Sequence, residues 1–244
     1  MEHEGRDRRS FLKQVATGGA VAVATAVPQA TMAQAGNPAP APHAAAGGAA
    51  TGPVGYTYLT PDEAAFIEAV VDHMIPADAW TPKGTDLGVN VYIDRALASG
   101  WGKGERLYRQ GPWKSGTANQ GYQLPLTPAE VYRAAIPAAT AHCVKQYGKR
   151  FEQLEASERE AFLVALQGGK LVLEDGPPAR TFFDMLYQNV MEGMFSDPLY
   201  GGNKDKAGWK LVGFGGVVAV HQQNVVRYLG KKFPVQPLGI ADMS

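Results

Sequence analysis

The sequence predicts a mostly α-helical protein: a single irregular helical domain with long ordered loops, preceded by a signal peptide and a flexible linker. Three observations lead to this fold class. Apolar residues recur at helical spacing over several segments, whereas few stretches alternate with the period of two typical of strands. Two of these segments begin with the same helix-start motif. The composition also changes near residue 58, from Ala, Pro and Gly to aromatics, Leu, Val and Met.

Residues 1–35 match a twin-arginine export signal. The motif D-R-R-S-F-L-K is followed by a weakly apolar run and by an A-x-A cleavage site that ends at Ala35. The apolar run would span only about 20 Å as a helix, which is short of the ~30 Å hydrocarbon core of a bilayer. We therefore expect a cleaved signal rather than a membrane anchor, and a periplasmic location. The signal residues are Arg8, Arg9, Phe11, Leu12 and Lys13.

The rest of the chain divides into a linker and one domain. Residues 36–57 are almost entirely Ala, Pro, Gly and small polar residues, a composition that cannot bury enough apolar surface to fold. Residues 58–244 are long enough for one domain with a sizeable core. Lys plus Arg and Asp plus Glu both number 23, and no basic stripe carries aromatics, so nucleic acid is not expected as the main partner. The single cysteine, Cys143, excludes an internal disulfide.

Helix-start signals define most of the expected elements. L-T-P-D-E at 59–63 and L-T-P-A-E at 126–130 both offer Thr as N-cap, Pro at the first helical position and Glu for a capping box. The first helix should end before Pro76. The second should run to Tyr147, with Gly148 as its C-terminal cap and a kink at Pro137.

Three further helices are expected. Ser157 and Glu160 would cap a third helix, which Gly168 and Gly169 stop. A fourth begins near Pro178 and carries Phe182, Phe183, Leu186 and Val190. A shorter helix should lie around residues 91–98.

The export signal raises the question of a cofactor, because the twin-arginine translocase carries folded proteins. A c-type haem needs C-x-x-C-H and an iron–sulfur cluster needs about four thiolates, which one cysteine cannot supply. The fragments G-W-G-K-G at 100–104 and G-F-G-G at 213–216 lack the full dinucleotide-binding spacing. We therefore expect no cofactor in this chain.

No catalytic or metal site emerges from the histidines and carboxylates. His73, His142 and His221 lie far apart in the sequence and form no i, i+4 pair, so each is expected to be structural. Acidic residues near 72–78 and 155–160 are best explained as surface or helix-start charges.

The stretch that begins at Met191 and ends in G-W-K-L-V-G-F-G-G combines aromatics and glycines without clear periodicity. Large aromatics in such a loop either pack on the core of this domain or remain exposed to contact another protein. Both alternatives stay open from the sequence. The candidate interface residues are Tyr200, Gly201, Gly202, Asn203, Trp209 and Phe214.

Several motifs together resemble the gluconate 2-dehydrogenase subunit 3 family. These are I-P-A-D, Y-R-Q-G-P-W, G-Y-Q-L-P-L-T-P-A-E, Y-G-K-R-F and D-P-L-Y-G-G-N-K-D-K-A-G-W-K-L-V-G-F, in that order between about Leu59 and Gly215. The chain departs from the family's expected pattern at Pro137. The resemblance implies a small subunit without catalytic residues of its own, in a complex with an FAD-containing large subunit and a multihaem cytochrome c that passes electrons to quinone.

The combined expectation is an accessory subunit of a periplasmic, membrane-associated dehydrogenase that oxidises gluconate or a related sugar acid or polyol. It would escort the flavoprotein through the twin-arginine translocase and stabilise the complex. The alternatives are a stand-alone enzyme or ligand-binding protein that uses His73, His142 or His221, and a structural periplasmic protein without a redox partner.

Overall fold

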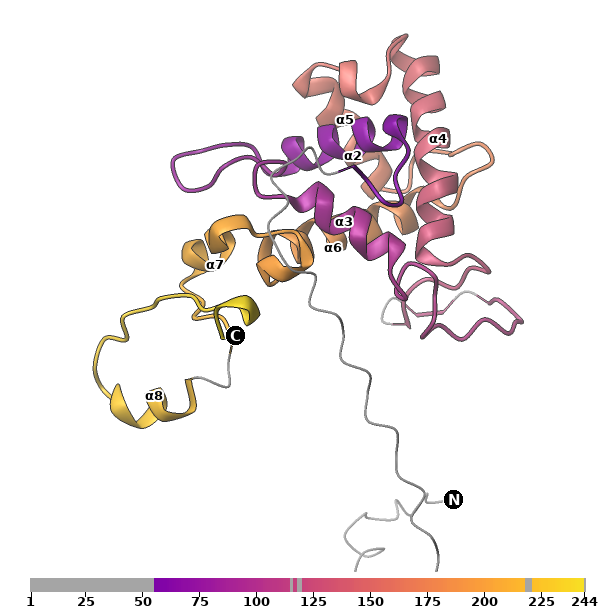
Figure 1. Ribbon diagram of the computed structural model, residues 1–244. Helices are drawn as coiled ribbons and strands as arrows, with labels where there is room; N and C mark the ends of the chain where they lie inside the picture. Colours follow the sequence, from indigo (N-terminus) through magenta and orange to yellow (C-terminus); the bar gives the residue numbers. More distant parts are fainter. Residues whose placement is uncertain (1–54, 115, 118–119, 218–220, 244) are drawn as a thin grey trace, which may run out of the picture. The chain divides into compact units, whose positions relative to one another are not determined.

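The structure, a computed structural model, describes residues 55–114, 116–117, 120–217 and 221–243. The signal residues Arg8 to Lys13, the cleavage site and most of the linker lie outside these described residues. The described residues all fall in one compact unit, which spans residues 52–244. Among them there are helices but no strands, which confirms the mostly helical class (Figure 1).

The two predicted capping boxes both form. Helix α2 (Pro61–Met74) starts at Thr60, whose backbone N–H donates to the Glu63 carboxylate at 2.8 Å. Helix α4 (Pro128–Tyr147) starts at Thr127 in the same way, with a 2.7 Å bond to Glu130. Each pair of side-chain and backbone bonds satisfies amides that have no partner within the helix. The short sequence motif therefore fixes both helix starts.

Helix α4 also ends as predicted, at Gly148 in the left-handed conformation with φ of 71°. Glycine adopts this conformation without the steric cost that a Cβ brings. The helix continues through Pro137 as one 20-residue element. The Pro137 ring lies on the exposed side of the helix. Because proline has no N–H, the Arg133 carbonyl lacks its usual helical donor.

Two predicted helix starts need correction. Helix α5 (Ala156–Gln167) begins earlier than the expected Ser157 cap, because Glu155 is the N-cap and its N–H donates to Glu158 at 2.9 Å. Glu160 instead reaches His73, at 2.9 Å. Helix α3 (Val89–Ala98) begins two residues before the expected position. Helix α6 (Ala179–Phe195) starts after Pro178, as expected.

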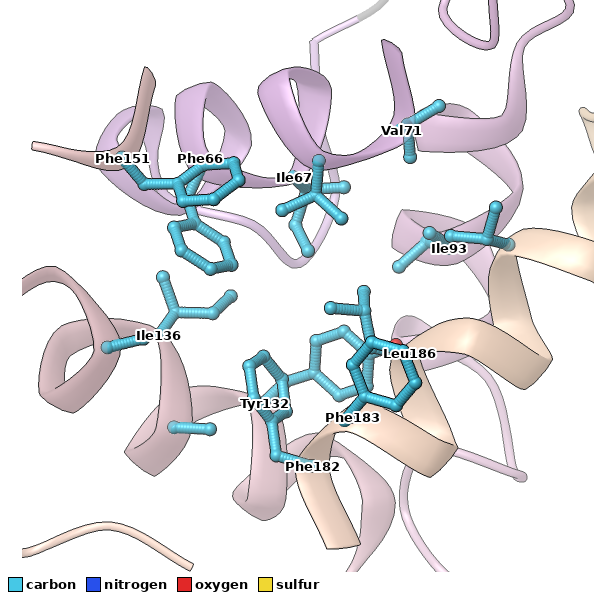
Figure 2. Packing of buried hydrophobic residues seen from close by; sticks show 14 of the residues in the cluster. Phe66, Ile67, Val71, Ile93, Tyr132, Ile136, Phe151, Phe182, Phe183 and Leu186 are labelled. Atoms are coloured by element: carbon cyan, nitrogen blue, oxygen red, sulfur yellow. The ribbon is translucent and has the colours of Figure 1, made fainter. Parts of the chain in front are cut away.

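The core lies between α2, α4 and α6. Figure 2 shows side chains from these three helices pointing toward one another. Phe66 packs against Phe151 and Phe182 with ring centroids 5.0 and 6.4 Å away, and Tyr132 meets Phe182 edge-on at 5.5 Å. Aromatic pairs in such geometries add to the free energy gained from burial. Helix α6 contacts α3, α4, α5 and the later helix α7 (Ala207–Val212), so it connects the core to the carboxyl-terminal part of the domain.

The amino-terminal entry to the domain is held by one buried carboxylate. Asp94 on α3 accepts the backbone N–H groups of Thr57, Tyr58 and Leu59 at 2.8, 2.8 and 2.9 Å. From α4, Arg133 donates to the Tyr58 carbonyl at 2.9 Å and stacks over the Tyr58 ring at 4.3 Å. The domain therefore begins with its backbone bound to two core helices.

Candidate functional site

The segment with the highest density of predicted interface residues runs from Asp197 to Phe214; we refer to it as the 197–214 loop. It follows α6 and contains two 3-10 turns, Pro198–Tyr200 and Lys204–Lys206, and then α7. The short helix was not expected, because the sequence there shows no clear period. The loop is therefore an ordered structure rather than an irregular connection.

Asn203 organises the loop from its centre. Its side chain is fully buried; the amide donates to the Ser196 carbonyl at 2.8 Å and its oxygen accepts the Gly208 N–H at 2.9 Å. Its φ of 49° is left-handed, which Asn tolerates better than most residues. The next residue, Lys204, donates its N–H to the Leu87 carbonyl at 3.0 Å. These bonds join the end of α6, the start of α7 and the turn before α3.

The glycines allow the loop to pack directly on neighbouring backbone. A Cβ at Gly202 would lie 2.1 Å from the Gly193 carbonyl oxygen, and one at Gly208 would lie 2.2 Å from the Met194 oxygen. Both distances are far below any real contact, and the obstructing atoms are backbone atoms of α6. Gly201 lies on the other side, where its carbonyl oxygen would be 2.4 Å from a Cβ at Gly88. The glycine motif is therefore a close-packing device, in addition to any contact with a partner.

Trp209 is buried, which corrects the expectation that its ring is available to another protein. Only 5% of the residue is exposed, and its indole N–H donates to the Phe195 carbonyl at 2.7 Å. That bond satisfies the last carbonyl of α6, which has no helical donor. Trp209 therefore follows the first of the two alternatives, packing on the protein's own core.

Tyr200 and Phe214 differ from Trp209, because both remain partly exposed. Tyr200 is 53% exposed and Phe214 is 42% exposed, and the Phe214 ring meets Trp209 edge-on at 5.3 Å. Further aliphatic side chains of the loop are also exposed. We refer to the exposed apolar side chains of the loop, which are Leu199, Tyr200, Leu211, Val212 and Phe214, as the apolar face of the 197–214 loop.

The tail of the described chain is bound to this loop. The Asp197 carboxylate accepts the N–H groups of Leu199 and Ile240 at 3.0 and 2.8 Å, and Lys206 pairs with Asp242. The Lys206 ammonium, and then the Gly239 N–H, lower the pKa of Asp242. A parallel bridge joins Gly216 to Leu238. The loop is thus fixed on its α6 side and on its tail side.

A polar network lies beneath the loop, between α3, α4 and α6. Tyr132 donates to Asn189 at 2.8 Å, and Asn189 and Tyr92 both donate to Glu192 at 3.2 Å. Burial, followed by the nearby Glu192 charge, raises the pKa of Tyr92 to about 12. Burial also raises the pKa of Tyr132 well above its usual value. Both phenols therefore keep their protons at neutral pH and act as hydrogen-bond donors.

The three histidines have separate local partners. His73 pairs with Glu160, and His142 packs on Phe162 with ring centroids 6.0 Å apart. His221 contacts the Gly215 carbonyl at 3.0 Å. Among the described residues, no group of three His, Cys, Asp or Glu side chains could hold a metal ion.

The other residues considered for a catalytic or metal site, Asp72, Asp78 and Cys143, also have structural roles. Asp72 pairs with Lys83 at 2.8 Å, and Asp78 accepts the N–H groups of its own turn. Cys143 is buried, and burial raises the pKa of its thiol to about 12, which makes it a poor nucleophile at neutral pH.

None of the helices in the described part is long and apolar enough to cross a membrane.

One cavity was not expected from the sequence. It is a solvent-open pocket near the tail, with a volume of about 310 Å³, and His221, Tyr228 and Phe233 are among the residues that line it. The Phe233 ring stands edge-on to both His221 and Tyr228, with centroid distances of 5.5 and 5.1 Å. Spacing alone could not have found it, because Phe233 returns to these side chains after the turn at Gly230.

Comparison with known proteins gives one clear relationship. Residues 61–216 match the family described as gluconate 2-dehydrogenase subunit 3. No curated protein and no solved structure matches the chain significantly. The matched range covers more than half of the chain, from the first turn of α2 to the residue that begins the tail bridge, and it includes the whole 197–214 loop. The chain therefore belongs to the gluconate 2-dehydrogenase subunit 3 family.

Proposed function

We propose that this protein is the non-catalytic small subunit of a periplasmic, membrane-associated dehydrogenase for gluconate or a related sugar acid or polyol. Its partners would be an FAD-containing large subunit and a multihaem cytochrome c. The subunit carries the twin-arginine signal for the complex, so the flavoprotein folds in the cytoplasm, binds this chain and is exported with it. After export, the subunit stabilises the assembled enzyme.

The observation that carries this proposal is the preorganised apolar face of the 197–214 loop. Asn203 and the close-packed glycines hold the backbone, so Tyr200 and Phe214 are exposed on a rigid support. A rigid surface loses little conformational entropy when it binds, which favours its use as an interface. Tyr is also enriched among the residues that dominate binding energy. We therefore assign the flavoprotein contact to this face.

The test is binding of the flavoprotein by the variant Tyr200→Ala/Phe214→Ala. Truncating an interface anchor costs about 2 kcal/mol or more, so the two changes together should weaken the complex by more than about a hundredfold if they act independently. Both side chains are about half exposed, so the variant should stay folded, with a melting temperature lowered mainly by the loss of the Phe214 contact with Trp209. Affinity is measured by titration with the purified flavoprotein.

Two control variants make the result interpretable. Tyr187→Ala on α6 removes a tyrosine that is 50% exposed, close to the exposure of Tyr200, and should leave binding unchanged. Trp209→Ala removes a core indole and should cost roughly 3 to 5 kcal/mol of folding free energy. If Tyr200→Ala/Phe214→Ala binds like the wild type, the loop is not the interface. A wild-type chain that binds no flavoprotein would instead support a stand-alone role.

A further inference from the structure

Helix α8 (Gln222–Arg227) has its polar and apolar sides reversed relative to a normal surface helix. His221, Asn224 and Tyr228 point inward: Asn224 lies 3.1 Å from the His221 ring nitrogen, and the His221 and Tyr228 rings meet Phe233. A surface helix normally buries its apolar stripe and exposes its polar residues. The side of this helix that faces Phe233 therefore carries polar and aromatic groups and lines the pocket described above.

The neighbouring side of the helix is aliphatic and largely exposed, and Val225 and Leu229 border the same pocket as His221 and Tyr228. Val225, Val226 and Leu229 are 71%, 81% and 81% exposed, and together with Gln222 they follow helical spacing. We refer to Gln222, Val225, Val226 and Leu229 as the outer face of α8. Clustered aliphatic side chains at such exposure are unfavourable in water and mark a surface that contacts something else.

The charged residues of α8 and of the segment that follows it are all positive, and the Arg227 guanidinium lies over the Tyr228 ring at 5.5 Å. Arg227, Lys231 and Lys232 are exposed, and none of them pairs with a carboxylate among the described residues. The sequence has no Asp or Glu between Asp205 and Asp242. The family match ends at residue 216, so this combination belongs to a segment beyond the family's common region. An apolar face on a segment whose only charges are uncompensated cations matches the chemistry of a bilayer that exposes anionic headgroups.

We propose that the outer face of α8 docks on an anionic phospholipid bilayer. Val225, Val226 and Leu229 insert at the boundary between headgroups and acyl chains, Lys231 and Lys232 contact the phosphates, and the nearby Arg227 adds to the attraction by the anionic surface. The short helix lies on the surface and does not span the bilayer. The segment thus gives the subunit its own membrane contact, independent of any partner subunit.

The test uses the full chain with an environment-sensitive fluorophore on Gln222→Cys, an exposed position of the outer face that leaves the three aliphatic side chains intact. Cys143 is buried, so the label attaches to the new thiol. Vesicles of phosphatidylcholine with phosphatidylglycerol should shift the emission to the blue, whereas vesicles of phosphatidylcholine alone should not. Raising the salt concentration should reverse the shift, because salt screens the attraction between exposed charges.

Matched variants test the two parts of the surface. Each cation near an anionic surface strengthens binding about fivefold, so Arg227→Gln/Lys231→Gln/Lys232→Gln should weaken vesicle binding roughly a hundredfold. Lys103→Gln/Arg106→Gln/Lys114→Gln removes the same charges from another exposed segment and should bind normally. Val225→Ser/Val226→Ser/Leu229→Ser should lose the blue shift while the charges remain.

Four results would overturn the proposal. They are the absence of a shift at position 222, an equal shift with both vesicle types, an equal shift for a label on Gln167→Cys of α5, and a shift only when the flavoprotein is added. The last result would assign the outer face of α8 to a protein partner. Because the vesicle assay contains no partner subunit, its outcome is separate from the binding test of the 197–214 loop.

Discussion

Asn203 shows how one buried residue can hold an exposed surface without lying on it. Its amide joins Ser196 to Gly208, and its left-handed backbone turns the chain between the two 3-10 turns. Both bonded groups belong to the backbone, so replacing the Asn203 side chain removes a hydrogen-bond partner from two backbone groups of the loop. The loop's shape therefore depends on this amide more than on any exposed residue.

Asn203→Ala should lower the free energy of unfolding by about 3 kcal/mol, because two bonded backbone groups lose their partner and Ala is strained at positive φ. The measurement is urea unfolding of the full chain. Asn203→Gly is the matched control: it loses the same two bonds but has no Cβ, so its loss should be about 1 kcal/mol smaller. Equal midpoints for Asn203→Ala and the wild type would contradict the role given to this residue.

Among the elements, helix α4 contains a local weakness that the fold tolerates. Pro137 interrupts its backbone ladder, yet the helix continues to Gly148 because Val131, Tyr132, Ile136 and Ala139 are buried against the core. Tertiary packing thus overrides the local preference at one position.

Pro137→Ala should stabilise the protein by about 1 to 3 kcal/mol, because the new N–H can donate to the Arg133 carbonyl and the exposed side chain disturbs no core contact. Thermal unfolding measures the effect as a higher melting temperature. Pro137→Gly restores the same N–H with a poorer helix former, so it should gain about 1 kcal/mol less. A lower melting temperature for Pro137→Ala would show that the ring makes a contact that the helix needs.

The elements also show where sequence reasoning succeeds. The starts of α2 and α4 were predicted because a capping box is contained within four residues. The start of α5 was misassigned because Ser157 and Glu160 fit the same motif, and only the fold shows that Glu160 is used by His73. Helices α7 and α8 were missed because each has only six residues, too few to display a period.

At the scale of the whole molecule, the family and the fold class were predictable from the sequence. Which aromatic residues of the 197–214 loop are buried and which are exposed was not. The sequence places Tyr200, Trp209 and Phe214 in one aromatic group. Their different roles depend on the Phe195 carbonyl and on the backbone of α6, which the sequence does not bring together. Long-range packing therefore decides which aromatic is core and which is surface.

The export proposal makes a prediction about the molecule as a unit. Replacing Arg8 and Arg9 with Lys should keep both this chain and the partner's dehydrogenase activity in the cytoplasm, because the translocase reads the arginine pair. Activity and antigen are measured in periplasmic and cytoplasmic fractions. Arg106→Lys/Arg109→Lys makes the same chemical change within the folded domain and should leave export intact. Unchanged periplasmic activity in the Arg8→Lys/Arg9→Lys variant would contradict the escort role.

The carboxylate of Asp94 has a mechanical consequence. If the chain is drawn through a translocase by its amino end, the pulling force reaches the domain at Thr57 and Tyr58. Three hydrogen bonds from backbone N–H groups to Asp94 pass that force into α3. The hydrogen bond from Arg133 to the Tyr58 carbonyl passes part of it into α4. Both helices pack on α6, and α6 holds the 197–214 loop. A force applied to the signal would thus be resisted by the core helices. A partner bound to the loop would move together with a domain whose amino-terminal residues stay attached to that core.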